Sequence, residues 1–174
     1  MSYVRGKNGI DFHPPGTGVR NNVSVANFSG TTGETILSSV LIPANTFVTT
    51  DIIDFYTLAT RTGLGTGTCS LRIRIGTTQT TGDTLAGTVT VSGTRNLYLP
   101  MVRRFVISGA STNTYCLSAT TSSVTHYNQT GGTSNLAINW RTNNYISVSF
   151  QAFSTTDNIN VEFIKLKRFD GDNR

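Results

Sequence analysis

The fold is decided by the stretch Gly30-Thr-Thr-Gly-Glu-Thr-Ile-Leu-Ser-Ser-Val-Leu-Ile-Pro-Ala-Asn-Thr-Phe47. A polar turn leads into an apolar run over 35–42, and Pro43, which has no amide proton for a sheet ladder, ends that run. Downstream, Ser70-Leu-Arg-Ile-Arg-Ile-Gly76 alternates apolar and polar residues. This alternation predicts a β-strand with one buried face, on which Arg72 and Arg74 point into water. A slip of one residue would bury both arginines, so the register of this strand is well defined.

Short apolar stretches separated by turn residues continue to the end of the chain. They predict strands over 35–42, 53–59, 70–76, 85–91, 97–107, 113–119, 135–140, 145–153 and 158–169. Pro100 requires that its strand lie at a sheet edge or contain a bulge. In the last strand the apolar residues switch from one face to the other near Phe163, which predicts a bulge there. The expected fold is all-β, an antiparallel two-sheet sandwich of about nine strands, jelly-roll-like in topology.

Composition and length favour a single domain of this kind. The chain has 174 residues, of which only 13% are charged. Thr, Ser, Asn and Gly suit strands and tight turns better than helices. A surface of neutral hydroxyls and amides indicates a particle component, a cell-surface module or an extracellular protein.

A formal net charge of +5 raises the question of nucleic acid. The basic residues, however, form no long run interleaved with aromatic residues. We therefore expect no nucleic-acid partner and interpret these charges as solvated strand faces. The basic positions considered are Arg72, Arg74, Arg103, Arg104, Lys165, Lys167 and Arg168.

The cysteines and the apolar segments limit the chemistry and location of the protein. Cys69 and Cys116 lie far apart, with no CxxC and no histidine pair, so we expect no metal site. Each falls in a strand pattern and is predicted to be a buried thiol, with a cross-sheet disulfide left open. The chain has no apolar run that would span a bilayer and no signal-peptide core, so we expect synthesis in a cytosol and no membrane insertion.

The first 28 residues differ from the remainder. Glycines and the pair Pro14-Pro15 interrupt every periodicity there, which predicts an extended arm over 1–28 and a β-sandwich domain over 29–174. Spaced apolar residues in the arm are typical of a segment that is ordered on another surface, although a flexible leader is the alternative. The candidate docking residues are Tyr3, Val4, Ile10, Phe12 and Val19.

Residues for catalysis are scarce. His13 lies in the arm and His126 in a loop, and no Gly-x-Ser-x-Gly elbow occurs. Asp51 and Asp54 are three residues apart at the start of a strand, on opposite faces, and are interpreted as turn-capping residues. We therefore expect no catalytic residues, no cofactor and no enzymatic activity.

One constellation has the composition of a carbohydrate site. An aromatic ring near the turn over 141–144 and the loop over 126–132 would be flanked by amide and guanidinium donors. Trp140 also has core spacing, and Tyr127 is then the better candidate for an exposed ring. The candidate ligand-binding residues are His126, Tyr127, Asn128, Trp140, Arg141 and Asn143.

The segments Thr31-Thr-Gly-Glu-Thr-Ile-Leu, Ser39-Val-Leu-Ile-Pro-Ala-Asn-Thr and Leu71-Arg-Ile-Arg-Ile-Gly resemble β-sandwich proteins of tailed bacteriophages. The resemblance covers roughly 28–80 and is to fibre, head-fibre and baseplate components. It implies a virion protein, most often a homotrimer, whose N-terminal segment docks on a capsid, portal or tail protein. Because no long shaft is present, it implies a short fibre, a knob or a capsid-decorating protein. The alternative is a carbohydrate-binding module that recognises a host-surface glycan.

Overall fold

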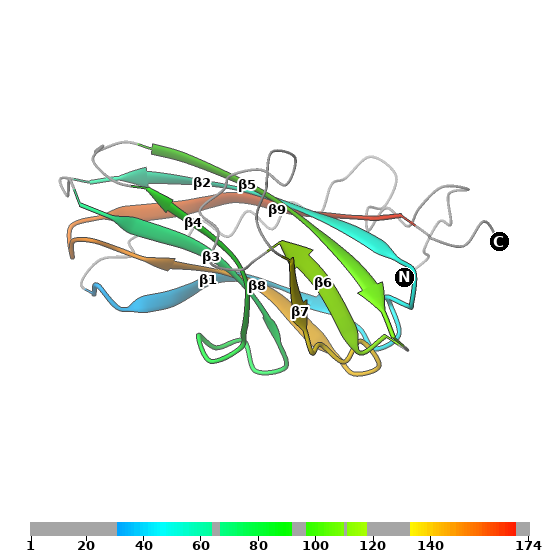
Figure 1. Cartoon of the computed structure of the whole chain (residues 1–174). Coiled ribbons are helices and arrows are strands. Elements are labelled where there is room, and N and C mark those ends of the chain that lie inside the picture. Colours follow the sequence, from blue (N-terminus) through cyan, green and yellow to red (C-terminus); the bar gives the residue numbers. More distant parts are fainter. Residues whose placement is uncertain (1–30, 64–66, 92–96, 110, 118–132, 170–174) are drawn as a thin grey trace.

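The computed structural model describes residues 31–63, 67–91, 97–109, 111–117 and 133–169 (Figure 1). These residues form nine β-strands in two antiparallel sheets, which confirms the predicted all-β sandwich. The strands are β1 (Glu34–Ile42), β2 (Ile52–Thr62), β3 (Cys69–Gly76), β4 (Thr84–Val91), β5 (Leu97–Ser108), β6 (Asn113–Leu117), β7 (Thr133–Leu136), β8 (Asn144–Gln151) and β9 (Asn158–Phe169). The predicted arm over 1–28 lies outside the described residues.

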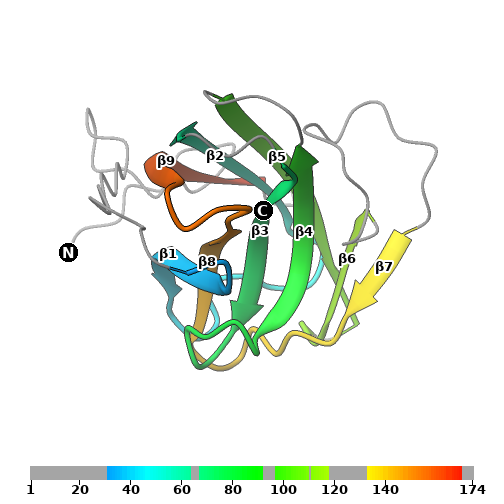
Figure 2. The ribbon, with the colours of Figure 1, turned by 90° about the vertical axis from the view of Figure 1, so that its left-hand side faces the viewer.

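The two sheets join strands that are distant in the chain. The four-stranded sheet has the order β1-β8-β3-β4, and the five-stranded sheet has the order β7-β6-β5-β2-β9. Figure 2 shows the five-stranded sheet running from β7 over β5 and β2 to β9, with the other sheet beneath it. The first two strands therefore pair with the last two, β1 with β8 and β2 with β9, as in a jelly roll.

The core lies between the sheets and follows the alternation of the sequence. In β3, Leu71, Ile73 and Ile75 are fully buried, and the residues between them point to the outer face. The same alternation in β2 and β5 buries Phe55 and Phe105. Both cysteines are buried and free, which confirms the buried-thiol interpretation.

Both predicted irregularities are present. The pairing of β2 with β9 shifts between Leu58 and Ala59, which oppose Phe163 and Val161, so Glu162 is the extra residue of a bulge. Pro100 pairs with Leu58 on one side. On the other side of β5, the described pairing with β6 covers only 106–108, so Pro100 occupies an edge where no amide proton is needed.

Two predicted strands are too long. The strand expected over 145–153 ends at Gln151. The strand expected over 135–140 ends at Leu136, and the chain then leaves the ladder. The amide of Trp140 donates to the carbonyl of Ser111, and its carbonyl accepts the amide of Asn45. These bonds tie the segment to two loops, not to a neighbouring strand, because the side chain of Trp140 enters the core.

Candidate functional site

Trp140 is a core residue, so the prediction of a sugar platform on its ring is wrong. Its side chain is 1% exposed, and its Nε1 donates to Thr114 Oγ1 at 2.8 Å. Phe47 packs edge-to-face against it with a centroid distance of 5.1 Å. A buried indole needs a partner for its N–H, and Thr114 supplies one. The sequence also allowed Trp140 to be a core residue, because of its spacing, and the structure confirms that alternative.

The turn that follows Trp140 is exposed but internally bonded. Arg141 and Asn143 are both exposed, and the Asn143 carboxamide oxygen accepts the amide of Ala44 at 2.8 Å. Asn144 donates from its side chain to the carbonyls of Asn139 and Thr142. These bonds shape the turn and connect it to the loop after β1.

The remaining candidate residues from the sequence are not placed. His126, Tyr127 and Asn128 lie outside the described residues, and so do the docking candidates Tyr3, Val4, Ile10, Phe12 and Val19. Of the candidate glycan site, the described residues therefore place only Arg141 and Asn143 at the surface.

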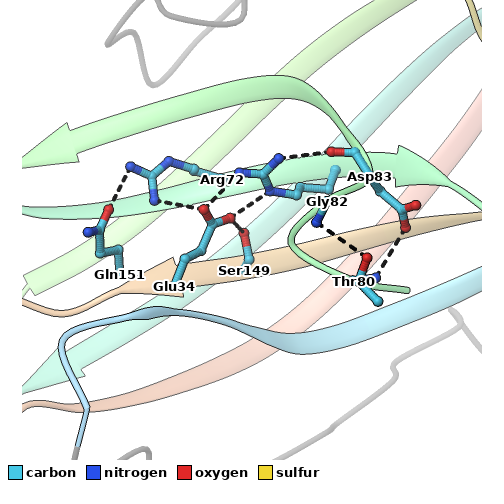
Figure 3. A network of polar contacts seen from close by, with 8 residues as sticks. Glu34, Arg72, Thr80, Gly82, Asp83, Ser149 and Gln151 are labelled. Carbon is cyan, nitrogen blue, oxygen red and sulfur yellow. Dashed lines mark hydrogen bonds and ion pairs between the residues drawn. The ribbon is translucent and has the colours of Figure 1, made fainter. Parts of the chain in front are cut away.

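A polar cluster lies on the outer face of the four-stranded sheet (Figure 3). Arg74 forms two hydrogen bonds to the Glu34 carboxylate, from Nε at 2.6 Å and from Nη2 at 2.7 Å. Arg72 contacts the same carboxylate at 3.3 Å and donates to Gln151 at 2.8 Å. The expectation that both arginines are simply solvated is therefore wrong, since their side chains are only 18% and 14% exposed. Strand pairing puts β1, β8 and β3 side by side, which brings Glu34 to them.

The charge of Glu34 depends on this cluster. Burial by itself raises the pKa of the carboxyl, but hydrogen bonds from Arg74 and Ser149 and the charges of Arg74 and Arg72 outweigh it. The pKa of Glu34 is consequently lowered, and the carboxylate is ionised at neutral pH. The cluster is a structural connection between three strands, because its donors and acceptors bond to one another.

Two buried carboxylates, Asp51 and Asp54, also form ion pairs. Asp54 forms a bidentate pair with Arg104, with both bonds at 2.7 Å, and Asp51 pairs with Arg168 at 2.8 Å. Asp51 additionally accepts the amide of Val48, as expected of a turn-capping residue. The interpretation as turn caps alone is therefore too narrow, because both carboxylates are almost fully buried and opposite an arginine.

Two arginines lie inside the sandwich, and for Arg103 this corrects the expectation of a solvated basic residue. Arg61 is fully buried and forms a bidentate bond with Asp157 at 2.9 and 3.0 Å. Arg103, on β5, donates to the carbonyl of Thr88 on β4 at 2.9 Å and so joins the two sheets. Because Gly87 has no side chain, the Arg103 side chain fits beside it; a Cβ at this position would lie 3.0 Å from Arg103 Nε.

The thiols occupy the same interior. Burial raises the pKa of Cys69, and it raises the pKa of Cys116 to about 11. Burial also lowers the pKa of Arg103. A thiol with such a pKa is almost entirely protonated at neutral pH and is a poor nucleophile. Neither cysteine has the environment of a catalytic residue.

A surface that the sequence interpretation missed lies on the outer side of the five-stranded sheet. Register places its outward residues in rows across β5, β2 and β9. The rows are Val106, Ile52 and Phe169; Arg104, Asp54 and Lys167; Val102, Tyr56 and Lys165; and Pro100, Leu58 and Phe163. We call this surface, together with Tyr98 on β5 and Tyr115 on β6, the outer aromatic face.

The outer aromatic face differs in chemistry from the outer face of the other sheet. Tyr98 is 77% exposed and Tyr115 is 40% exposed. The four-stranded sheet instead presents hydroxyl pairs, such as Ser39 with Ser147 at 2.8 Å, beside the Glu34 cluster. The sequence contained a signal for this difference: β2 and β5 have large apolar residues on both faces, which a strand with one solvated face does not require.

The described residues contain no cluster of three or more His, Cys, Asp or Glu that would hold a metal ion. The same part of the chain contains no helix long and apolar enough to cross a membrane. Three of its buried carboxylates, Asp51, Asp54 and Asp157, face arginines in ion pairs. The fourth, Asp83, accepts hydrogen bonds from Thr78 Oγ1 and from the amide of Thr80. These carboxylates hold strands and turns of the described chain together.

No protein-family model matches the chain, and no curated protein matches it. Among solved structures, the chain is similar to the CBM2 module of the evolved Dit of Lactobacillus casei BL23 phage J-1. The match has 10% sequence identity and a TM-score of 0.34, and it covers 77% of this chain and 69% of that chain. A match at this level says nothing about the function or the ligands of this chain.

Proposed function

We propose that this chain is a non-enzymatic structural protein of a tailed-phage virion, a short fibre, knob or capsid-decorating protein. In this proposal, residues 1–28 anchor the protein on a capsid, portal or tail protein, and the domain over 29–174 is displayed. The observation that supports it is the boundary at β1. The nine strands between Glu34 and Phe169 enclose a hydrophobic core of their own, and the proposal assigns the apolar residues of the arm to a partner.

Two further observations support a structural role. The phage resemblance falls on β1 and β3, two strands of the same sheet, so the similar segments belong to the scaffold. The acidic side chains Asp51, Asp54 and Asp157 each face a buried or half-buried arginine. Charges used in this way hold strands and loops together and are not free for proton transfer.

The mechanism would be adhesive. The arm would bury its spaced apolar side chains in a partner and add backbone hydrogen bonds to it. Association of the sandwich into a homotrimer would present three arms at once, so that weak contacts multiply through effective concentration.

Deletion of residues 1–28 tests this function. We expect the truncated protein to keep the thermal unfolding midpoint and the trimer mass of the full chain, yet to be lost from particles. A triple variant Y3A/I10A/F12A should behave in the same way, whereas the matched variant S2A/N8A/T17A should incorporate normally. Normal incorporation of the truncated protein would contradict the anchor, and a monomer mass of 18.8 kDa by light scattering would contradict the trimer.

A further inference from the structure

We propose that the outer aromatic face binds an anionic polysaccharide of the kind that coats bacterial cells. The inference rests on the proposed function, because it needs the sandwich to be displayed outside the particle. It replaces the turn around Trp140, whose ring is buried, as the location of a glycan site.

The first argument is the charge of this face. Lys165 and Lys167 are exposed and point outward from β9, two residues apart. Among the described residues neither lysine forms a salt bridge, while Lys167 lies 4.6 Å from the centroid of the Phe169 ring. Two positive charges on one strand face attract a polymer with repeated negative charges.

The carboxylates on the same face are already engaged. Asp54 accepts both bonds of Arg104 and also the hydroxyl of Tyr56 at 3.2 Å. Glu162 accepts from Thr60 at 2.9 Å and from Asn160 at 2.8 Å. The charge of Asp54 is therefore balanced by Arg104, whereas the hydrogen bonds of Glu162 come from neutral groups and do not neutralise it. Among the described residues of this face, Arg104, Lys165 and Lys167 against Asp54 and Glu162 leave a net charge of +1.

The second argument is the shape and the aromatic content of the face. Phe163 and Phe169 flank the lysines on β9, and six residues of a strand extend about 20 Å. Tyr98 and Tyr115 are exposed on the neighbouring strands. A flat aromatic ring with a polar edge suits the apolar side of a sugar ring and its hydroxyls. An extended polysaccharide fits along such a face without a pocket.

Charge complementarity favours this occupant over a second copy of the chain, because two copies packed through this face would bring like-charged lysines together. A nucleic acid carries phosphodiesters like those of a teichoic acid, so binding to DNA is an outcome of the test that would overturn the proposal. Lysines on an edge strand also discourage aggregation, so the test must separate that role from ligand binding.

The test is a titration of the full chain with four defined polymers. A polyuronate provides carboxylates, a polyol-phosphate teichoic acid provides phosphodiesters, and dextran and single-stranded DNA serve as comparisons. We expect binding to one or both anionic polysaccharides, weaker binding as salt rises, and no binding to dextran. The variant K165Q/K167Q should bind about tenfold more weakly, whereas K165R/K167R should bind like the parent.

A Tyr98→Ser variant should also weaken binding, with no change in mass by light scattering. Binding that is unaffected by K165Q/K167Q, binding lost in Arg141→Ser, or DNA bound as tightly as either polysaccharide would each overturn the proposal. A change in oligomer mass in Y98S would show that the face is a subunit interface and would overturn it as well. Failure here leaves the virion role standing, because incorporation into particles depends on the arm and is measured separately.

Discussion

At the scale of single residues, polar partners decide where large side chains lie. Trp140 enters the core because Thr114 accepts its indole N–H, and Arg61 is tolerated in the interior because Asp157 balances its charge. A buried polar group without such a partner would destabilise the fold. These two contacts explain how Trp140, a binding candidate in the sequence, and Arg61 are both accommodated in the interior.

The bond between Trp140 and Thr114 can be tested with a nearly isosteric substitution. Thr114→Val removes the acceptor and leaves a buried indole N–H, so we expect a loss of about 1–3 kcal/mol in the free energy of unfolding. Urea denaturation followed by the fluorescence of the single tryptophan measures it. Thr77→Val, at an exposed threonine, should cost no more than about 0.5 kcal/mol. Equal losses in the two variants would show that the bond does not hold Trp140 in place.

At the scale of elements, strand pairing brings together charges that are distant in the chain. Glu34 at the start of β1 meets Arg72 and Arg74 on β3 because β8 lies between those strands and contributes Ser149. The cluster spans three strands, so it stabilises their mutual register as well as neutralising charge. The bulge at Glu162 is a second effect at this scale, since it reverses the phase of β9 and leaves Phe163 on the outer aromatic face.

The lowered pKa of Glu34 predicts a pH-dependent contribution to stability. A depressed carboxyl pKa stabilises the folded state above the ordinary value of 4.5, and this stability is lost as the pH falls through the folded pKa. We therefore expect Glu34→Gln to cost roughly 1 kcal/mol at pH 7 and less at pH 3, measured by urea denaturation at both values. An equal cost at both pH values would show that the charge of Glu34 contributes nothing.

At the scale of the whole molecule, the two sheets close one interior that contains both thiols. Arg103 connects β5 to β4 across that interior, and Cys69 and Cys116 are buried and free within it. The long-range pairs of β1 with β8 and β2 with β9 join both ends of the described chain. We expect such a fold to open as a unit.

Thiol labelling tests that expectation. At pH 8 the raised pKa of each cysteine and its burial should make labelling of the native protein at least about a thousandfold slower than in denaturant, where both thiols react. A Thr77→Cys variant should gain one rapidly reacting thiol in the native state. Rapid labelling of the parent protein would indicate local opening of one sheet.

The sequence by itself determined the local features of this protein. Alternation predicted the strands and their buried faces, Pro100 predicted an edge or a bulge, and the change of phase near Phe163 predicted the bulge there, because each depends on neighbours within a few residues. Only the tertiary structure decided which strands pair, which residue bonds the indole of the buried Trp140, and which charges meet. Arg61 and Asp157 are 96 residues apart, and Glu34 and Arg74 are 40 apart, so no local pattern links them. The outer aromatic face also depends on the tertiary structure, because its rows form only when β5, β2 and β9 pair in one register.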